Sequence, residues 1–189
     1  MKKLPVPLDL KRVKVFPLAE RLSESKVEDI LIDPEAAPPV VSPALLTAVK
    51  DSARKIATAH QRKASVMLLY GAHLIKNGGA TILNQLIELG WVTHLGTNGA
   101  GTIHDWEFSY LGRSTESVKN NVATGTFGTW DETGRCIHLA LLAGALREEG
   151  YGYSLGRFIM EDGVTLPSIE NLQDALRAEP AHPLSPARA

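Results

Sequence analysis

The sequence of 189 residues lacks several features that would assign it to a familiar class. It has a single cysteine, Cys136, so the chain cannot form an internal disulfide, and this usage fits a reducing compartment. Its net charge is −1, which gives no positive excess to hold a phosphate backbone, so nucleic acid is not an expected partner. The start, Met1-Lys2-Lys3, is followed by Pro5, Pro7 and Asp9 instead of an apolar run. We therefore expect neither a signal peptide nor a membrane span, and a cytoplasmic location.

Familiar catalytic and metal-binding motifs are also missing from the sequence. The six histidines and the cysteine do not recur at spacings that would hold a metal ion, so no metal site is expected. The chain contains no Walker A motif, no G-x-S-x-G and no H-E-x-x-H. Any chemistry must therefore be carried by a less standard arrangement of residues.

The pattern along the chain predicts three segments. Residues 1–40 form an N-terminal extension that ends in the proline-rich connector Pro34–Pro39. Residues 41–165 form a nucleotide-binding domain, and residues 166–189 form a C-terminal helix and tail. The tail contains Ser185-Pro186 followed by good helix formers, which is a helix-start signal one turn from the last residue. We therefore expect this point to be a truncation of a longer protein.

The middle segment predicts an α/β fold. Ser42 and Pro43 begin a helix whose apolar face is expected to pack on a sheet; its residues are Leu45, Leu46, Val49, Ala53, Ile56, Ala57 and His60. The apolar run 66–70 predicts a buried strand, residues 82–89 a helix that ends at Gly90, and residues 91–95 a second strand. Strand, helix and strand of this length form a right-handed parallel unit. The expected fold is Rossmann-like, with a mainly parallel and possibly incomplete sheet flanked by helices.

The segment Thr97-Asn98-Gly99-Ala100-Gly101 is the leading candidate for a ligand site. It follows the second predicted strand, and ligands of open parallel sheets bind beyond the carboxyl ends of the strands. Glycines let the backbone approach a phosphate, and the helix expected from about Thr102 would offer free N–H groups. The loop from Gly71, with His73, is expected to face the same crevice. The alternative is a plain tight turn capped by Asn98 and Thr102, because the full G-x-G-x-x-G pattern is absent.

Two polar residues follow this segment. His104 is a candidate for proton transfer or for contact with a cofactor hydroxyl, and Asp105 for holding a ribose hydroxyl or an amine. The alternative for Asp105 is that it only complements the helix dipole. Further along, the Gly/Thr-rich segment 123–130 is expected to be a lid or binding loop, with Trp130 either a packing residue or a cover for a bound ring.

Residues 70–112 resemble the deoxyhypusine synthase family and its bacterial relatives. The residues that carry the resemblance are Gly71-Ala72-His73-Leu74-Ile75-Lys76, Gly78, Leu89-Gly90, Val92–Leu95, Thr97, Asn98-Gly99-Ala100-Gly101, Ile103-His104-Asp105, Leu111-Gly112 and Phe127-Gly128. The resemblance implies an NAD-dependent enzyme that oxidises a polyamine and transfers an aminoalkyl group, working as a homotetramer with a small-molecule amine substrate. It places His73, Thr97, Asn98, Gly99, Ala100 and Gly101 at the NAD.

The sequence departs from the true synthases of that family at the amine site. Two glutamates that grip the polyamine correspond to Ile103 and His104, so only Asp105 is acidic there. The family's catalytic lysine belongs to a C-terminal half, and no lysine follows Lys119. Two alternatives therefore stand beside the transferase: a non-catalytic nucleotide- or metabolite-binding module, and an unrelated Rossmann-like oxidoreductase that uses His104 with Asp105.

Overall fold

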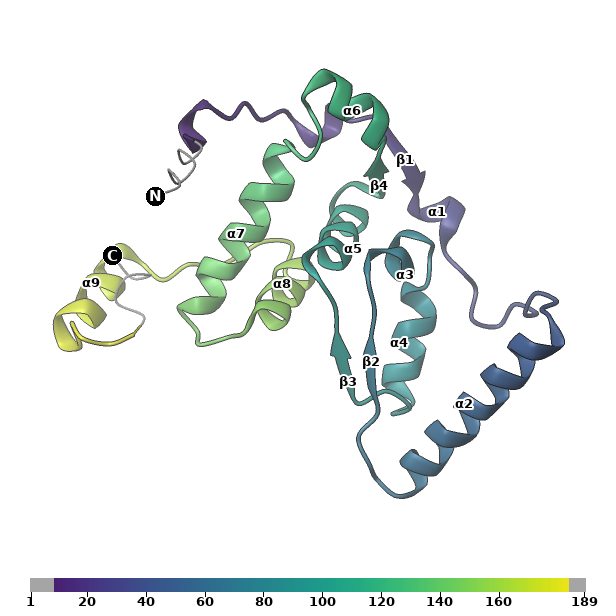
Figure 1. Ribbon diagram of the computed structural model, residues 1–189. Helices are drawn as coiled ribbons and strands as arrows, with labels where there is room; N and C mark the ends of the chain where they lie inside the picture. The colour runs from purple at the N-terminus through teal and green to yellow at the C-terminus, as the bar shows by residue number, and fades with distance from the viewer. Residues whose placement is uncertain (1–8, 184–189) are drawn as a thin grey trace, which may run out of the picture. The chain divides into compact units, whose positions relative to one another are not determined.

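The computed structural model describes residues 9–183, which divide into two compact units (Figure 1). One unit consists of residues 9–22 together with 116–183, and the other of residues 23–115. The predictions made for Met1-Lys2-Lys3 and for Ser185-Pro186 fall outside the described residues. The division does not follow the segments 1–40, 41–165 and 166–189, because a strand at residues 23–26 joins the middle of the chain by pairing with residues 113–116.

The unit of residues 23–115 alternates short strands with helices. Its elements are β1 (Ser23–Lys26), α1 (Val27–Ile30), α2 (Pro43–Gln61), β2 (Met67–Leu69), α3 (Ala72–Lys76), α4 (Ala80–Glu88), β3 (His94–Gly96), α5 (Gly99–Leu111) and β4 (Arg113–Glu116). β2 and β3 are parallel, with Met67 opposite His94 and Leu69 opposite Gly96, which confirms the predicted strand–helix–strand unit. The mixed α/β class is confirmed as well.

The predicted sheet is broader than the one that forms. The described strands make two two-stranded sheets, β1 with β4 and β2 with β3, instead of one mainly parallel sheet. β3 also begins at His94, three residues later than predicted. The reason is that the backbone N–H groups of Trp91 and Val92 both donate to the carbonyl of Leu86 and so close the end of α4. Gly90, at φ +71°, makes this turn possible and ends the helix where the sequence predicts.

Helix α2 begins where the sequence predicts but packs differently. The Ser42 hydroxyl accepts a hydrogen bond from the N–H of Leu45 at 3.3 Å, and Pro43 is the first helical residue. The expected packing of its apolar face on a sheet does not occur, since Leu45, Leu46 and Val49 are all exposed. The helix is anchored at its other end, where the ring of His60 contacts that of Trp91.

The other unit is helical. Its elements are two 3₁₀ turns, η1 (Leu10–Arg12) and η2 (Leu18–Glu20), and the helices α6 (Val118–Thr124), α7 (Asp131–Ala145), α8 (Tyr151–Met160) and α9 (Ile169–Ala178). α7 packs on α8, and the most deeply buried side chains include Leu18, Ile137, Ala140, Ala143 and Leu155. Gly144 of α7 meets Ser154 of α8 so closely that a methyl group on Gly144 would overlap the serine side chain.

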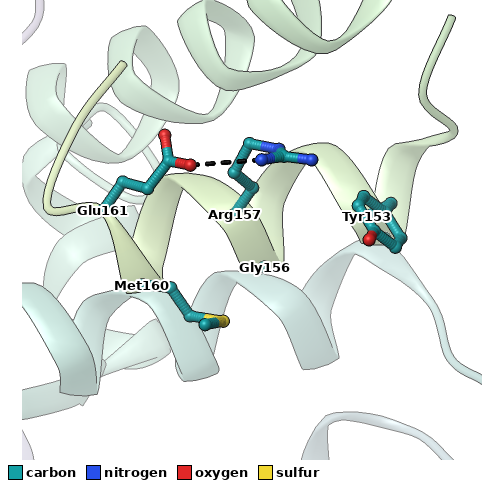
Figure 2. Close-up of a pocket in the computed structure, with 6 residues that line it drawn as sticks. Tyr153, Gly156, Arg157, Met160 and Glu161 are labelled. Atoms are coloured by element: carbon teal, nitrogen blue, oxygen red, sulfur yellow. Dashed lines mark hydrogen bonds and ion pairs between the residues drawn. The ribbon is translucent and has the colours of Figure 1, made fainter. Parts of the chain in front are cut away.

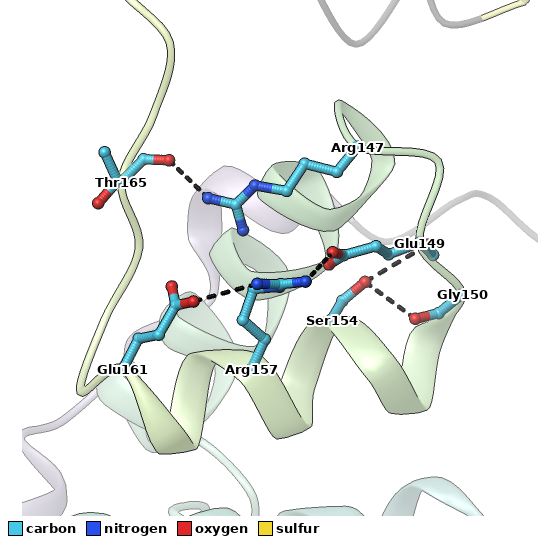
Figure 3. A network of polar contacts seen from close by, with 7 residues as sticks. All are labelled: Arg147, Glu149, Gly150, Ser154, Arg157, Glu161 and Thr165. Carbon is cyan, nitrogen blue, oxygen red and sulfur yellow. Dashed lines mark hydrogen bonds and ion pairs between the residues drawn. The ribbon is translucent and has the colours of Figure 1, made fainter.

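Ion pairs and hydrogen bonds join the end of α7 to α8 (Figure 3). The guanidinium of Arg157 pairs with Glu149 at 2.7 Å and with Glu161 at 3.2 Å. Both carboxylates favour its charged form, so they raise the pKa of Arg157 above its ordinary value. The Ser154 hydroxyl donates to the carbonyl of Gly150 at 2.9 Å, which completes the turn between the two helices.

The Gly/Thr-rich segment before α7 is anchored to the rest of its unit. The carboxylate of Glu116 accepts hydrogen bonds from Gly128 N–H at 3.0 Å, Asn121 Nδ2 at 2.6 Å and Trp130 Nε1 at 2.9 Å. The guanidinium of Arg21 lies 5.7 Å from the centre of the Trp130 ring. Trp130 therefore serves as a packing residue, which is one of the two roles that the sequence predicts for it.

Candidate functional site

The carboxyl ends of β2 and β3 bring two loops together. Tyr70 and Gly71 follow β2, and Thr97 and Asn98 follow β3. A side-chain hydrogen bond joins Tyr70 to Thr97, and the amide nitrogen of Asn98 lies beside Gly71. The two loops therefore lie side by side beyond the carboxyl ends of the strands, as their positions after neighbouring parallel strands predict.

The second loop is shorter than the sequence suggests. α5 begins at Gly99, so Gly99, Ala100 and Gly101 form its first turn and only Thr97 and Asn98 lie between strand and helix. The cause is the Asn98 side chain, whose Oδ1 accepts from Gly101 N–H at 3.1 Å and caps the helix. A methyl group on Gly101 would overlap the Thr97 hydroxyl, so this turn needs a residue without a side chain.

The first turn of α5 leaves donors available. Among the hydrogen bonds of residues 9–183, the N–H groups of Gly99 and Ala100 have no acceptor. Both residues are exposed, and nothing stands over Gly99. The Asn98 cap uses only one of the N–H groups at the helix start. The others stay available to an anion, so capping and anion binding can occur together.

Asp105 lies on α5 in the wall of a pocket. It is the seventh residue of α5, beyond the first turn in which a carboxylate gains from the helix dipole. Asp105 is exposed, but protein atoms lie close around its carboxyl and replace part of its hydration. This partial desolvation raises the pKa of the Asp105 carboxyl. Burial and the nearby Asp105 charge together raise the pKa of Tyr70. Asp105 therefore lies within electrostatic reach of the Tyr70–Thr97 pair.

The pocket beside Asp105 has a volume of about 210 Å³. Its walls are mainly apolar and come from α1, α3 and α5 and the loops next to them; they include Val27, Ile30, Leu31, Ile75, Phe108 and Ser109. The α1 side is held in place by the backbone, since Ile32 N–H donates to the carbonyl of Gly78 at 3.1 Å. An apolar pocket with one carboxylate in its wall suits a small aliphatic ligand that carries a positive charge.

His104 belongs to a different cluster from Asp105. Its Nδ1 lies 2.7 Å from Ser114 Oγ on β4, and that hydroxyl donates to Glu107 Oε2 at 2.5 Å. Because the one hydroxyl proton of Ser114 goes to the carboxylate, Nδ1 of His104 carries the proton that completes the chain. The structure therefore places Thr97 and Asn98 beside Tyr70 and Gly71, sets Asp105 within electrostatic reach of Tyr70, and directs Nδ1 of His104 towards β4.

Replacing Ser114 by alanine is expected to lower the free energy of unfolding by about 1–3 kcal/mol. Ser114 and Glu107 are 0% and 1% exposed, so the change removes a donor from a buried carboxylate that water cannot reach. Urea unfolding followed by circular dichroism measures the loss. The matched control is Ser109→Ala at an exposed position of α5, the helix that carries Glu107, which should change the free energy by less than about 0.5 kcal/mol. Equal effects of the two changes would contradict the role of this cluster.

Two other pockets are weaker candidates. One lies along α8 (Figure 2), with a volume of about 360 Å³, and every residue that lines it belongs to that helix or its last turn: Gly152, Tyr153, Gly156, Arg157, Met160 and Glu161. Its only cation, Arg157, is already paired with Glu149 and Glu161. The other, of about 280 Å³, lies where α2 and α4 end, beside His60 and Lys63. Helix carboxyl ends carry negative dipole charge, so they do not favour an anion there.

Some residues of the site are not among those that the sequence predicts. Tyr70 was assigned to a strand, although its place directly before Gly71 puts it at the carboxyl end of that strand. Val27 and Ile30 were assigned to the N-terminal extension, and no local signal connects them to a pocket that forms only when α1 meets α3 and α5. His73 is the second residue of α3 and is exposed; it does not line the Asp105 pocket.

Comparison with known proteins gives no relative: no family model, no curated protein and no solved structure matches the chain. Within residues 9–183, none of the helices combines the length and the hydropathy needed to cross a bilayer. The same residues contain no group of three or more His, Cys, Asp or Glu side chains placed to hold a metal ion.

Proposed function

We propose that the unit of residues 23–115 binds NAD beyond the carboxyl ends of β2 and β3 and oxidises a small amine held beside Asp105. The observation that carries the proposal is the position of Asp105, which lines an apolar pocket and acts electrostatically on the Tyr70–Thr97 pair between the two loops. The deoxyhypusine synthase resemblance of residues 70–112 supports the same cofactor and substrate class. We further propose that β2 and β3 belong to a Rossmann-like parallel sheet.

The first turn of α5 fits the phosphates of a dinucleotide. The N–H groups of Gly99 and Ala100 and the positive end of a 13-residue helix favour an anion, and exposed small residues let it approach. Asn98 and Thr97 would flank the phosphates, with Gly101 holding the turn close to Thr97. His73 would line the same crevice from α3.

The Asp105 pocket fits an alkylammonium group. A carboxylate whose pKa is raised by partial desolvation gains from a positive charge nearby, because the ligand restores part of the stabilisation lost where protein replaces water. The apolar walls at Ile30, Ile75 and Phe108 suit the methylene chain of the amine. The volume of about 210 Å³ limits this part of the ligand to a small group.

The residues divide the work of amine oxidation between them. Asp105 would hold the ammonium and accept its proton, and the neutral amine would then lose a hydride from the adjacent carbon to form an iminium ion. NAD, when bound, is the group that accepts such a hydride. Tyr70 and Thr97 would fix the crevice between the two ligands. His104 remains a candidate for proton transfer, with its Nδ1 hydrogen-bonded to Ser114 and through it to Glu107.

A second candidate function is a non-catalytic nucleotide-binding module. The observation that favours it is the separation of His104 from Asp105, since the Nδ1 contact of His104 is with Ser114 and leads away from the pocket. The two functions differ in one measurement. NAD binding without formation of NADH in the presence of putrescine, spermidine or agmatine would support the module and reject the amine oxidase.

Replacing Gly99 by aspartate tests the NAD site. A negative charge at the first position of α5 complements the helix dipole, so stability should be unchanged or rise by about 0.3–1 kcal/mol. The same charge repels a diphosphate, and we expect NAD affinity in isothermal titration calorimetry to fall at least tenfold.

The control for this variant is Asn84→Asp, which adds the same charge on an exposed position of α4. It should leave NAD affinity within twofold of the unaltered protein. Absence of NAD binding by the unaltered chain, or equal binding by the Gly99→Asp variant, would reject the site.

A further inference from the structure

The pocket beside Asp105 has an exposed polar part and a buried apolar part. Asp105 and Ser109 are exposed, and because they lie four residues apart on α5 they share one face of that helix. Ile75, which is 5% exposed, and Gly78 are the buried members of the same lining. A ligand therefore enters beside Asp105 and Ser109 and meets the apolar wall further in.

The pocket offers a single charge to its ligand. Among the residues within 9–183 that line it, only Asp105 has an ionisable side chain. The acidic residues of α1, Glu28 and Asp29, are exposed and lie outside the lining. The pocket can therefore pair one ammonium group, and a second ammonium inside it would have no carboxylate to pair with.

A close backbone contact forms part of the buried side of the pocket. Gly78 has φ +86°, and a methyl group on it would overlap the carbonyl of Ile30 at the end of α1. The hydrogen bond from Ile32 N–H to the carbonyl of Gly78 holds the two segments together. An ammonium group placed on this side would lose its water without gaining a carboxylate, and an unpaired buried charge is costly.

We propose that the preferred ligand of this pocket is an alkyl monoamine, bound with its ammonium at Asp105 and its alkyl chain against Ile75 and Phe108. The inference rests on the proposed amine site and narrows its substrate class. A monoamine pairs its one charge and buries only methylene groups, each of which raises affinity about three- to fourfold. A diamine must either bury its second ammonium or leave its chain in solvent. It therefore binds the same site more weakly and is oxidised only at higher concentration.

The test compares butylamine with putrescine, which carries one more ammonium group on the same alkyl chain. Both are titrated calorimetrically into the full chain with NAD present, at about pH 8, where alkylamines are charged. We expect butylamine to bind at least tenfold more tightly than putrescine, and affinity to rise with each methylene from ethylamine to butylamine. Equal or tighter binding of putrescine would overturn the inference and leave the proposed amine site standing. Binding of neither amine, or no loss of binding in Asp105→Asn, would reject the amine site itself.

A second carboxylate in the pocket should shift the preference towards diamines. Ser109→Asp places an acid on the same face of α5, with about 5–6 Å between its Cβ and that of Asp105, so a diamine can pair both of its charges. We expect the ratio of putrescine affinity to butylamine affinity to rise at least tenfold. The matched control is Asn84→Asp, which adds the same charge at an exposed position of α4 outside the lining and should leave the ratio within twofold. An unchanged ratio in Ser109→Asp would overturn the inference.

Discussion

Amine affinity is expected to fall about 10- to 150-fold when Asp105 is replaced by asparagine, while NAD affinity is retained. The change removes the charge that would hold an ammonium group, and hydrogen bonds to charged groups contribute about 1.5–3 kcal/mol. It leaves Asn98 and the first turn of α5 in place. Calorimetric titration with putrescine in the presence of NAD measures the first effect, and titration with NAD alone measures the second.

The pH dependence of amine binding follows from the same carboxyl. Burial raises the pKa of Asp105, so in the folded protein it stays protonated to a higher pH than an ordinary aspartate. Amine affinity should therefore increase as pH rises through that raised pKa, and the dependence should vanish in Asp105→Asn. A raised carboxyl pKa also means that the ionised form opposes folding. The free energy of unfolding therefore falls as pH rises from the ordinary aspartate pKa through the raised one.

This linkage separates a binding role from a structural one. At neutral pH the Asp105 charge opposes folding, so Asp105→Asn is expected to match or exceed the unaltered protein in urea unfolding. If Asp105 served only to support the helix, the same change would lower the free energy of unfolding. Lower stability together with unchanged amine affinity would contradict the proposed site.

Replacing Gly144 by alanine is expected to lower the stability of the helical unit by about 3 kcal/mol. A methyl group on Gly144 would overlap the Ser154 side chain and lie 3.3 Å from Ser154 Cα, so α7 and α8 would have to separate. The displacement would also strain the Ser154–Gly150 hydrogen bond that closes the turn. Urea unfolding followed by circular dichroism and tryptophan fluorescence measures the loss.

Gly134 provides the control in the same helix. Nothing lies above it, so Gly134→Ala gains helix propensity without a clash and should raise stability by up to about 1 kcal/mol. The two substitutions are chemically identical and are expected to act in opposite directions. A midpoint for Gly144→Ala equal to that of the unaltered protein would mean that the α7–α8 contact is looser than the structure has it.

Local signals predicted the elements whose ends depend on neighbouring residues. Ser42 with Pro43 marked the start of α2, Gly90 the end of α4, and the parallel pairing of β2 and β3 followed from the length of the crossover. The start of α5 was predicted three residues late because Gly99 and Gly101 indicate a loop. The Asn98 cap offsets the low helix propensity of these glycines, a balance that composition does not reveal.

Local sequence patterns do not predict contacts between residues that are far apart in the chain. β1 and β4 are short and polar, and their pairing joins residues about 90 positions apart, at a modest entropic cost because the cost of closing a loop rises only slowly with its length. The Asp105 pocket needs α1 against α3 and α5, and the environment of His104 needs Ser114 on β4. Helical periodicity predicted the apolar face of α2 but not what covers it.

The pairing of β1 with β4 has a consequence for the order in which the chain folds. The helical unit joins Leu18 N–H to Glu132 Oε2 across 114 positions, a long loop to close from the unfolded chain. When residues 23–115 fold first, β1 and β4 bring the two ends of that segment together, and the loop that remains is short. This lowers the entropic cost of closure by about 1.5 kcal/mol. The segment 23–115 also emerges from the ribosome before residues 116–183, so synthesis and entropy favour the same sequence of events.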